Sequence, residues 1–283
     1  MTRQKIDYGI DLGTTNSAIA RMENGDPKIR KTDTLKDTMP SSISFNRKGK
    51  IMVGDAAFNT LKSERLSAIR TWTKEVNAFI EFKRTMGTEK RYECPAAGRS
   101  FDSEELSAEV LKKLVSFIQD EPVDAAVITV PAMFDIAQKD ATKRAAHQAG
   151  FEQVELLQEP IAASMAYGLG GRSKDGFWLV FDFGGGTFDA ALVHVEDGVM
   201  QVKDSAGDNY LGGKNLDMAM VEQIIIPYLE SEYEVEGILE DDDKRLVLQN
   251  AMKQYAEDAK IRLSFQDDYN ILSDVGDIPP TPE

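Results

Sequence analysis

The chain contains two copies of one pattern: a strand-like run, a loop of small residues, a second strand-like run, a glycine turn and a third strand. The first copy begins at KIDYGID (5–11) and turns at NGD, and the second begins at FWLVFDF (177–183) and turns at EDG. Asn-Gly and Asp-Gly between alternating apolar residues predict β-hairpins. In each copy an aspartate, Asp11 or Asp182, closes the first strand just before the loop. The repeat predicts two lobes on one plan that clamp a ligand between them.

The rest of the first lobe alternates strands and helices, which predicts an α/β fold. Asp102 is the expected N-cap of a helix at 103–121, with Glu105 three residues later. An apolar run at 124–130, ended by Pro131, is typical of a buried parallel strand. A helix stopped by Gly150, a strand at 152–158 and a short helix from Glu159 follow, and residues 40 to 101 interrupt this pattern as an inserted subdomain.

The second lobe is expected to be incomplete. We predict lobe I over 1–175 and a partial lobe II over 176–283, with phosphate-loop hairpins at 176–206 and a helical/β insert at 212–283. No counterpart of the 124–132 segment follows, so we expect a fragment cut at a proline-rich loop; the alternative is the natural end of a small protein. The acidic run LEDDDKR (239–245) indicates a solvated helix start, with a functional acidic patch as the alternative.

Composition restricts the class of ligand and the compartment. The 283 residues carry a formal net charge of −15, which argues against general nucleic-acid binding. No apolar window is long enough for a membrane helix, so no membrane association is expected. The single cysteine, Cys94, indicates a reducing cytoplasm, and with two histidines any bound cation is expected to have oxygen ligands.

The two glycine loops match neither of the common nucleotide motifs. A Walker A motif is absent, and GGGTFD has Asp189 where the dinucleotide fingerprint has its third glycine. Glycines in such a hairpin loop are expected to adopt φ > 0 and to direct backbone N–H groups at an anion. Thr14, Thr15 and Thr187 add hydroxyl donors, so the loops predict phosphate binding.

The neighbouring carboxylates would repel a phosphate unless a cation lies between them. Mg²⁺ accepts one or two carboxylates together with phosphate and several waters. Phosphoryl transfer needs mainly positioning and charge neutralisation, which this arrangement supplies. The alternative is a pair of tight hairpins with turn aspartates at Asp11 and Asp182.

With these residues in view, GIDLGTTNS (9–17) and FDFGGGTFD (181–189) resemble the phosphate loops of the actin-like ATPase superfamily. Further segments, in the same order, resemble the ATPase domain of the heat-shock protein 70 (DnaK-like) chaperones. They are MPSSISF (39–45), NAFIEFKRTMG (77–87), SAEVLKKL (107–114), AAVITVPAMF (125–134), EPIAASMAYGLG (159–170), YLGGKNLD (210–217) and AEDAKIRLS (256–264). The resemblance implies an actin-like ATPase fold with a ribonuclease H-like motif, two lobes each built on a βββαβα unit, and an incomplete second lobe.

The resemblance also implies residue roles. Lys83 matches the catalytic lysine that reaches the γ-phosphate and the attacking water, Glu159 matches a glutamate that orders water and metal, and Pro131 matches a proline that couples nucleotide to the peptide-binding domain. By the same resemblance, the residues of the first phosphate loop are Gly13, Thr14, Thr15 and Asn16, and those of the second are Gly184, Gly185, Gly186 and Thr187, with Thr187 and Asp182 also catalytic. A Mg²⁺ shell, bound mostly through water and with K⁺ nearby, includes Asp11, Asp182 and Asp189. The residues that bind ribose and adenine are Glu257, Lys260 and Ser264. The i, i+3, i+7 spacing of this last set places it on one helix face.

Each of these residues also has an ordinary interpretation, and the chain departs from the family in places. Taken alone, Lys83 would be interpreted as a surface lysine, and Glu257 and Lys260 as an ordinary surface pair. Glu159 could simply begin a helix, and Pro131 could simply end a strand. The family usually has Tyr-Phe-Asn and then an arginine where this chain has Met133, Phe134, Asp135 and Lys139, and many members have an arginine at Ile261. The family's later Gly-Gly adenosine loop, peptide-binding domain and lid have no counterpart.

The resulting hypothesis is a cytoplasmic DnaK-type stress-response chaperone that binds and hydrolyses ATP with Mg²⁺, with K⁺ as a further cofactor. Unfolded client peptides, bound through a domain outside this sequence, a J-domain co-chaperone and a nucleotide-exchange factor are the partners that the resemblance implies. We expect the fragment alone to bind ATP weakly. The alternatives are a sugar kinase of the same superfamily and a filament-forming or nucleotide-sensing protein.

Overall fold

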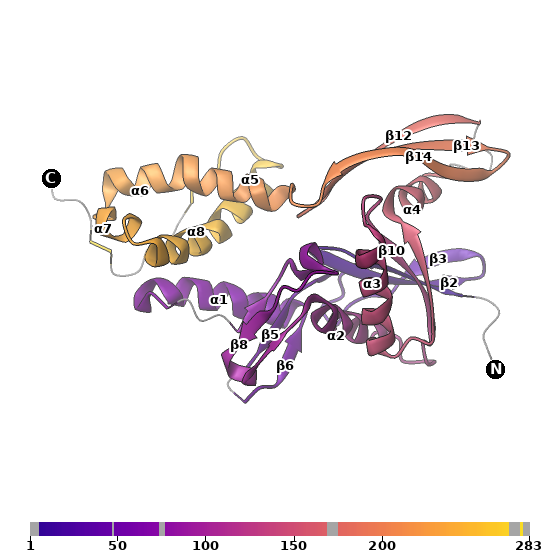
Figure 1. Cartoon of the computed structure of the whole chain (residues 1–283). Helices are drawn as coiled ribbons and strands as arrows, with labels where there is room; N and C mark the ends of the chain where they lie inside the picture. Colours follow the sequence, from indigo (N-terminus) through magenta and orange to yellow (C-terminus); the bar gives the residue numbers. More distant parts are fainter. Residues whose placement is uncertain (1–5, 47, 74–76, 169–174, 272–277, 280–283) are drawn as a thin grey trace. The chain divides into compact units, whose positions relative to one another are not determined.

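Both predicted repeats fold into the same three-stranded antiparallel meander in the computed structural model of the chain (Figure 1). The structure describes residues 6–46, 48–73, 77–168, 175–271 and 278–279. The first meander is β1 (Tyr8–Leu12), β2 (Asn16–Glu23) and β3 (Asp26–Ile29), and the second is β12 (Gly176–Phe183), β13 (Phe188–Glu196) and β14 (Val199–Asp208). The duplication that the sequence predicted is therefore confirmed.

The glycine turns close both meanders in the predicted way. Asn24 and Gly25 have φ angles of 53° and 92°, and Asp197 and Gly198 have φ angles of 50° and 77°. Two consecutive left-handed residues form the type I′ turn, whose twist matches that of paired strands. Each turn thus fixes the register of the hairpin that it closes.

The two meanders also share a register. Asp11 pairs with Ala18 in the first meander, and Asp182 pairs with Asp189 in the second. The last pair before each loop is Leu12 with Ser17 in one copy and Phe183 with Phe188 in the other. Asp11 and Asp182 therefore occupy equivalent positions, one residue before the end of the first strand.

Within the described residues, the first meander is extended into a larger sheet and the second is not. Strand β1 pairs in parallel with β10 (Ala125–Val130), and β10 pairs in parallel with β11 (Gln153–Gln158), which gives the order β11-β10-β1-β2-β3, with β4 (Met39–Pro40) paired to β2. The connecting helices are α2 (Ser103–Val115), α3 (Ile136–Ala149) and α4 (Glu159–Ala166). Since β1, β10 and β11 are parallel, their carboxyl ends meet at one edge, where ligands bind in open α/β sheets.

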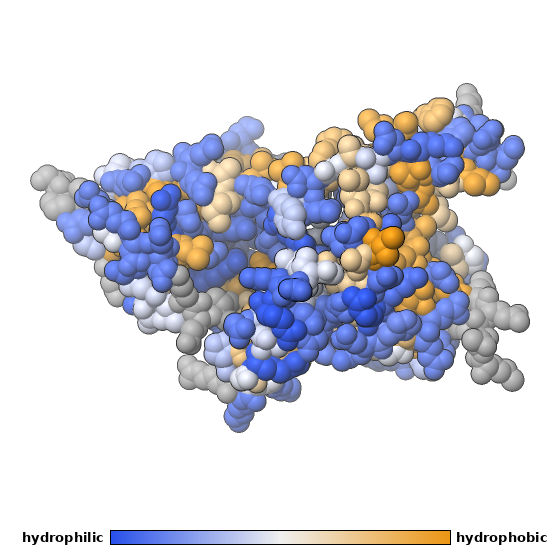
Figure 2. Space-filling model, viewed as in Figure 1, coloured by the Kyte–Doolittle hydropathy of each residue, from blue (hydrophilic) through white to orange (hydrophobic). Residues whose placement is uncertain are grey.

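Equivalent apolar positions in the two copies differ in burial. Tyr8, Ile10 and Leu12 are at most 2% exposed and form a core with apolar residues of α2. Their equivalents Leu179, Phe181 and Phe183 are 72%, 67% and 45% exposed. Figure 2 shows apolar residues on the surface at the upper right, where Figure 1 draws β12–β14. The first copy thus supplies the core of the larger sheet, whereas this face of the second copy is open.

The segment predicted as an insert, 40–101, contains several short elements. Its strands are β5 (Ile43–Phe45), β6 (Ile51–Val53) and β7 (Ala78–Phe79) in one sheet, and β8 (Tyr92–Cys94) with β9 (Arg99–Phe101) in another; its helices are α1 (Asp55–Thr71) and the 3₁₀ turns η1 (Phe82–Thr85) and η2 (Pro95–Ala97). Phe45 stacks on Phe101 with centroids 4.7 Å apart, and both belong to the core of the larger sheet. This packing fixes the subdomain that carries Lys83 in η1.

The chain divides into two compact units, Met1–Phe58 with Ala78–Leu211, and Asn59–Asn77 with Gly212–Glu283. The second unit packs part of α1 with α5 (Gly213–Met220), the π-helical turn η3 (Val221–Ile225), α6 (Ile226–Glu232), α7 (Glu236–Leu239) and α8 (Asp242–Leu263). The predicted lobe boundary at residue 175 falls inside the first unit, because β12–β14 pack on α4. The lobes themselves stay a prediction. In the described part of the chain, no helix is long and apolar enough to cross a membrane.

The helix starts follow the sequence signals closely, whereas α2, expected to continue to residue 121, ends at Val115. The Asp102 side chain accepts from Glu105 N at 2.8 Å, and Asp102 N donates to Glu105 Oε2 at 2.9 Å. Asp135 caps α3 in the same way with Gln138, and Gly150 ends α3 with a φ of 107°. Asp241 caps α8, so the acidic run at 239–245 is a helix start as predicted.

Replacing Asp102 by Ala is expected to lower the free energy of unfolding by about 1 kcal/mol, because an N-cap is lost at a helix that packs on the main core. Thermal unfolding of Asp102→Ala against Asp102→Asn measures the effect, since Asn keeps a capping oxygen. Equal losses of stability in both variants would show that the Arg91 ion pair to Asp102, at 3.0 Å, matters more than the cap.

Candidate functional site

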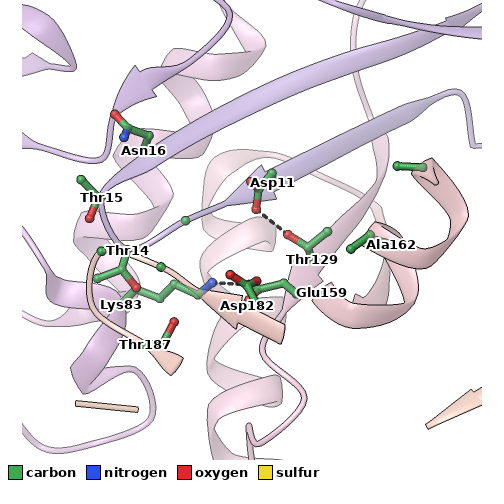
Figure 3. A pocket seen from close by; sticks show the side chains of 15 residues that line it. Asp11, Thr14, Thr15, Asn16, Lys83, Thr129, Glu159, Ala162, Asp182 and Thr187 are labelled. Carbon is green, nitrogen blue, oxygen red and sulfur yellow. Dashed lines mark hydrogen bonds and ion pairs between the residues drawn. The ribbon is translucent and has the colours of Figure 1, made fainter. Parts of the chain in front are cut away.

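A cavity of about 460 Å³ opens where the parallel strands of the first sheet end (Figure 3). Strand ends, both glycine loops, η1 and α4 contribute to it. Its lining residues are Asp11, Gly13, Thr14, Thr15, Asn16, Lys83, Thr129, Glu159, Ala162, Ala163, Ala166, Asp182, Gly184, Gly185 and Thr187. The cavity brings together residues from distant parts of the chain that the sequence had singled out for phosphate, metal and catalysis.

The two glycine loops lie against each other. A Cβ atom added to Gly185 would meet Thr15 Oγ1 at 1.9 Å, and one added to Gly186 would meet Thr14 Cγ2 at 2.7 Å. Within the first loop, a Cβ on Gly13 would be 2.1 Å from Asn16 O. These glycines are therefore required by close approach of one loop to the other and of the first loop to itself.

The expectation of positive φ angles in these loops is wrong. Neither Gly13 nor Gly184, Gly185 or Gly186 has a positive φ. At Gly13, Gly185 and Gly186 the close approach of neighbouring atoms, rather than a positive φ angle, is what excludes a side chain. The sequence could not distinguish these two uses of glycine, because both follow from the missing Cβ.

Hydrogen bonds hold the loops in place, and a buried threonine hydroxyl is left without a partner among the described residues. Ser41 Oγ donates to Gly13 O at 2.7 Å, Ser41 N donates to Thr15 O at 2.8 Å, and Gly184 N donates to Thr187 O at 2.9 Å. Thr15 Oγ1 is buried and has no hydrogen-bond partner within the described residues. A buried hydroxyl without a partner is costly, so its position fits a donor to a bound anion. Ser41 was not identified from the sequence; its segment MPSSISF was noted only for the resemblance.

Lys83 is held in the cavity by a buried ion pair. Its Nζ lies 2.7 Å from Glu159 Oε1, and the two side chains are 6% and 15% exposed. The same ammonium lies 5.6 Å from the centroid of the Phe134 ring. Figure 3 shows Lys83, Glu159 and Asp182 pointing toward one another. The interpretation of Lys83 as an ordinary surface lysine is therefore excluded.

The backbone around η1 explains how Lys83 reaches the cavity. Glu81 has a left-handed φ of 60° and turns the chain into η1. Arg84, one residue after Lys83, forms an ion pair with Glu81 at 2.9 Å and donates to Tyr210 O at 2.5 Å. Left-handed conformation in a non-glycine residue persists only where the surroundings impose it. These contacts fix the direction in which η1 presents Lys83.

Carboxylates outnumber cations in the cavity, and their pKa values reflect this. Burial raises the pKa of Glu159, against the attraction of Lys83, and the charges of Asp11 and Asp182 raise it further. Burial and the charge of Asp11 also raise the pKa of Asp182, again against Lys83. Asp11 is held by Thr129 Oγ1, which donates to its Oδ1 at 2.8 Å. The site therefore carries excess negative charge that a cation would neutralise.

Asp189 lies behind the cavity rather than in its lining. It is 2% exposed, and burial and the charge of Asp182 raise its pKa, whereas a hydrogen bond from the Met133 backbone N–H lowers it. Its Oδ1 has no hydrogen-bond partner among the residues described.

Pro131, the predicted coupling residue, also lies outside the lining of the cavity. It is buried directly after β10, and its carbonyl oxygen accepts a hydrogen bond from Phe134 N at 3.2 Å.

The donor set fits a hard cation held mostly through water. Asp11 and Asp182 offer carboxylate oxygens, the ligands that Mg²⁺ prefers. In the described ranges no three Asp, Glu, His or Cys side chains are close enough to hold a metal ion directly. A cation here would need water and phosphate oxygens to complete its coordination, as Mg²⁺ usually does.

The residues predicted to grip ribose and adenine lie in the second unit. Glu257 and Lys260 share one face of α8, and Ser264 follows its last residue, with Ser264 Oγ donating to Lys260 O at 3.1 Å. Both charged residues are paired: Glu257 Oε1 lies 2.7 Å from Lys214 Nζ, and Lys260 Nζ lies 2.5 Å from Asp217 Oδ1. Lys214 and Asp217 were not predicted as site residues; the sequence signal was their place in the YLGGKNLD segment.

A Gly185→Ala substitution is expected to lower the free energy of unfolding by about 1–3 kcal/mol, the usual cost of overpacking. The added methyl group would overlap Thr15 Oγ1, so the two loops would have to separate. Gly184→Ala is the matched control, since its Cβ would be no closer than 3.4 Å to its neighbours. Thermal unfolding of both variants checks this, and equal stabilities would contradict the close approach of the loops.

Asp182→Asn is expected to stabilise the protein at pH 7 when nucleotide and divalent cations are absent. The folded-state pKa of Asp182 lies above its ordinary value of 3.8. Between these two pKa values the native state binds more protons than the unfolded state, so the free energy of unfolding falls as the pH rises through this range. After allowing for solvent screening of this half-buried group, the variant should melt about 1–2 °C higher at pH 7, and the difference should disappear as the pH falls below the ordinary pKa of 3.8. Exposed Asp204→Asn is the control. A lower melting temperature for Asp182→Asn at both pH values would contradict the charge argument.

Comparison with known protein families gives one finding. The family model described as Hsp70 protein matches residues 7–275. The matched range contains both glycine loops, Lys83, Glu159 and α8.

Proposed function

The chain belongs to the Hsp70 family, and from this premise we propose residue roles for ATP hydrolysis at the cavity that holds Lys83 and Glu159. Hsp70 proteins are chaperones with an ATPase domain of the actin-like fold, which binds ATP or ADP with Mg²⁺ and works with client peptides and co-chaperones. The observation that carries the proposal is the buried Lys83–Glu159 ion pair, 2.7 Å long, in a cavity lined by two glycine loops.

The loops bind the phosphates of ATP. Backbone N–H groups of Gly13, Gly185 and Gly186 approach the phosphate oxygens closely because no Cβ intervenes, while Gly184 N donates within the loop to Thr187 O. Hydroxyl groups of Thr14, Thr15 and Thr187 donate to the same oxygens, and Asn16 completes the first loop. Thr15 supports this role most directly, since its hydroxyl is buried without a partner in the described chain.

Asp11 and Asp182 would hold the Mg²⁺ shell, with Asp189 behind them. When bound, Mg²⁺ neutralises phosphate charge and supplies Lewis-acid stabilisation of the phosphoryl oxygens. Thr129 orients Asp11 through its 2.8 Å hydrogen bond. A K⁺ ion nearby is a further part of the proposal, supported by the surplus of carboxylates over cations.

Lys83 and Glu159 act on the reacting atoms. Lys83 Nζ directs positive charge at the γ-phosphate and the attacking water, and Glu159 orders that water and accepts its proton. Because burial raises the pKa of Glu159, its carboxylate is a stronger base than an exposed one. Water oxygen bonds to the γ-phosphorus, the bond to the β,γ-bridging oxygen breaks, and ADP with inorganic phosphate is released. Thr187 hydroxyl assists by holding a γ-phosphate oxygen.

The remaining roles are proposed on the resemblance and on position. Glu257, Lys260 and Ser264 bind ribose and adenine, and Pro131 couples nucleotide state to peptide binding. Pro131 directly follows β10, and the backbone of Met133, two residues later, lowers the pKa of Asp189 behind the second loop; this nearness of the two segments supports the coupling role. A J-domain co-chaperone, a nucleotide-exchange factor, a stress-response role and a cytoplasmic location belong to the same proposal.

Lys83→Ala is expected to reduce ATP hydrolysis by about 100-fold or more, the usual loss when one donor to the transition-state charge is removed. Nucleotide affinity should change little, because the loops remain intact. Phosphate release at saturating Mg²⁺-ATP measures the rate, and Lys112→Ala, at an exposed position on α2, is the control. Hydrolysis by Lys83→Ala at the rate of the unmodified protein would refute the assignment.

A further inference from the structure

Two ion pairs join α5 to α8 in the second unit. Lys214 Nζ lies 2.7 Å from Glu257 Oε1, and Lys260 Nζ lies 2.5 Å from Asp217 Oδ1. Lys260 also donates to Gly213 O at 3.1 Å, at the first residue of α5. Three residues of α5 therefore fix the two charged residues of α8 to which adenosine contacts are assigned above.

The burial of the α5 partners makes these pairs persistent. Lys214 is 6% exposed and Asp217 is fully buried. A buried charge without its partner is strongly unfavourable, so neither side chain can leave while the unit is folded. The start of α5 is itself fixed, since Gly212 N donates to Asn215 Oδ1 at 3.0 Å. The α8 residues are more exposed, with Glu257 at 17% and Lys260 at 31%.

Each α8 residue keeps part of its hydrogen-bonding capacity. Lys260 has three N–H donors, of which one is directed at Gly213 O, while its ammonium forms a close ion pair with Asp217. The buried carboxylate oxygens of Asp217 have no hydrogen-bond partner among the described residues. Glu257 uses Oε1 for Lys214, and its Oε2 has no hydrogen bond to any described residue. One donor and one acceptor, a helical turn apart, thus remain for a ligand.

The charges of this cluster cancel. Lys214 and Lys260 supply two positive charges, and Asp217 and Glu257 supply two negative charges. A neutral cluster offering one oriented donor and one oriented acceptor suits hydroxyl groups, which both donate and accept. It does not suit a phosphate, which would meet a carboxylate without net attraction.

We infer that Lys214 is a positioning residue for ribose recognition: it holds the Glu257 carboxylate so that Oε2 accepts from a ribose hydroxyl. The inference rests on the proposed function of Glu257 and adds how the direction of that side chain is fixed. Without Lys214, Glu257 can rotate into solvent and satisfy both oxygens with water. Lys214 then determines preference for a ribose over a sugar without hydroxyls, while the phosphate loops determine affinity for the triphosphate.

The test compares ATP with 2′,3′-dideoxy-ATP by calorimetry, in the presence of Mg²⁺, for the whole chain. One hydrogen bond to a charged acceptor should make the unmodified protein prefer ATP by about tenfold or more. Lys214→Met should reduce that preference to about twofold, and Lys214→Gln, which keeps an N–H donor for Glu257, should retain an intermediate preference. The affinity for Mg²⁺-tripolyphosphate should stay within about twofold in every variant, because tripolyphosphate lacks the sugar.

A double-mutant cycle separates positioning from general damage. If Lys214 acts through Glu257, then Lys214→Met should change the preference for ATP little in a Glu257→Gln background. The inference would be overturned if both single Lys214 variants kept the full preference for ATP over 2′,3′-dideoxy-ATP. It would also be overturned if Lys214→Met reduced this preference as much in the Glu257→Gln background as in the unmodified protein. Unmodified protein that binds tripolyphosphate but does not prefer ATP would also overturn it, while the phosphate part of the proposed function stands. Failure to bind either ligand would instead refute the proposed function, and the inference with it.

Discussion

A buried ammonium group at Lys83 is surrounded by more negative charge than it can neutralise. Glu159 pairs with it at 2.7 Å, and Asp11 and Asp182 line the same cavity. The arrangement depends on three separate parts of the fold: the parallel strand ends that bring Asp11, Thr129 and Glu159 together, the second meander that supplies Asp182, and the left-handed turn at Glu81 that directs η1 inward. Removal of the lysine charge would leave Glu159 buried and unpaired, so this pair links folding of the site to its chemistry.

The internal repeat explains why two loops can share one ligand. Equivalent registers place Asp11 and Asp182 at the same position of their strands, and the loops that follow contact each other through Thr15 and Gly185. The copies have nevertheless diverged in packing, since Ile10 is buried under α2 while its equivalent Phe181 is 67% exposed. The two meanders therefore share their strand register but not the burial of their side chains. What they have in common is the geometry of the loops and not the packing of a core.

Much of this was predictable because it follows from local backbone chemistry. Asn24-Gly25 and Asp197-Gly198 form their turns, and Asp102 with Glu105 forms its capping box, whatever surrounds them. Other features depend on contacts between distant residues and left no local signal: the close approach that excludes a side chain at Gly185, the support of Gly13 by Ser41, and the pairing of Lys214 with Glu257. Asp135 has a local signal that was not used. Its position three residues before Gln138 is typical of a helix N-cap, but the sequence comparison noted Asp135 only because the family usually has an asparagine there.

The cavity of the first unit and the α5–α8 cluster of the second unit differ in their balance of charged side chains. The cavity of the first unit holds Asp11, Asp182 and Glu159 against Lys83, so it is negative by two charges and attracts a triphosphate only together with cations. The α5–α8 cluster has two positive and two negative side chains, so it has no net preference for charge and can select only by hydrogen bonds. Affinity for Mg²⁺-ATP is therefore expected to respond strongly to cation concentration, and selection of the sugar is not. A sugar kinase of the same superfamily would need a general base facing a second hydroxyl substrate. Among the described residues of the two clusters, the proposed function already gives Asp11, Asp182, Glu159 and Glu257 other roles, and Asp217 is buried against Lys260.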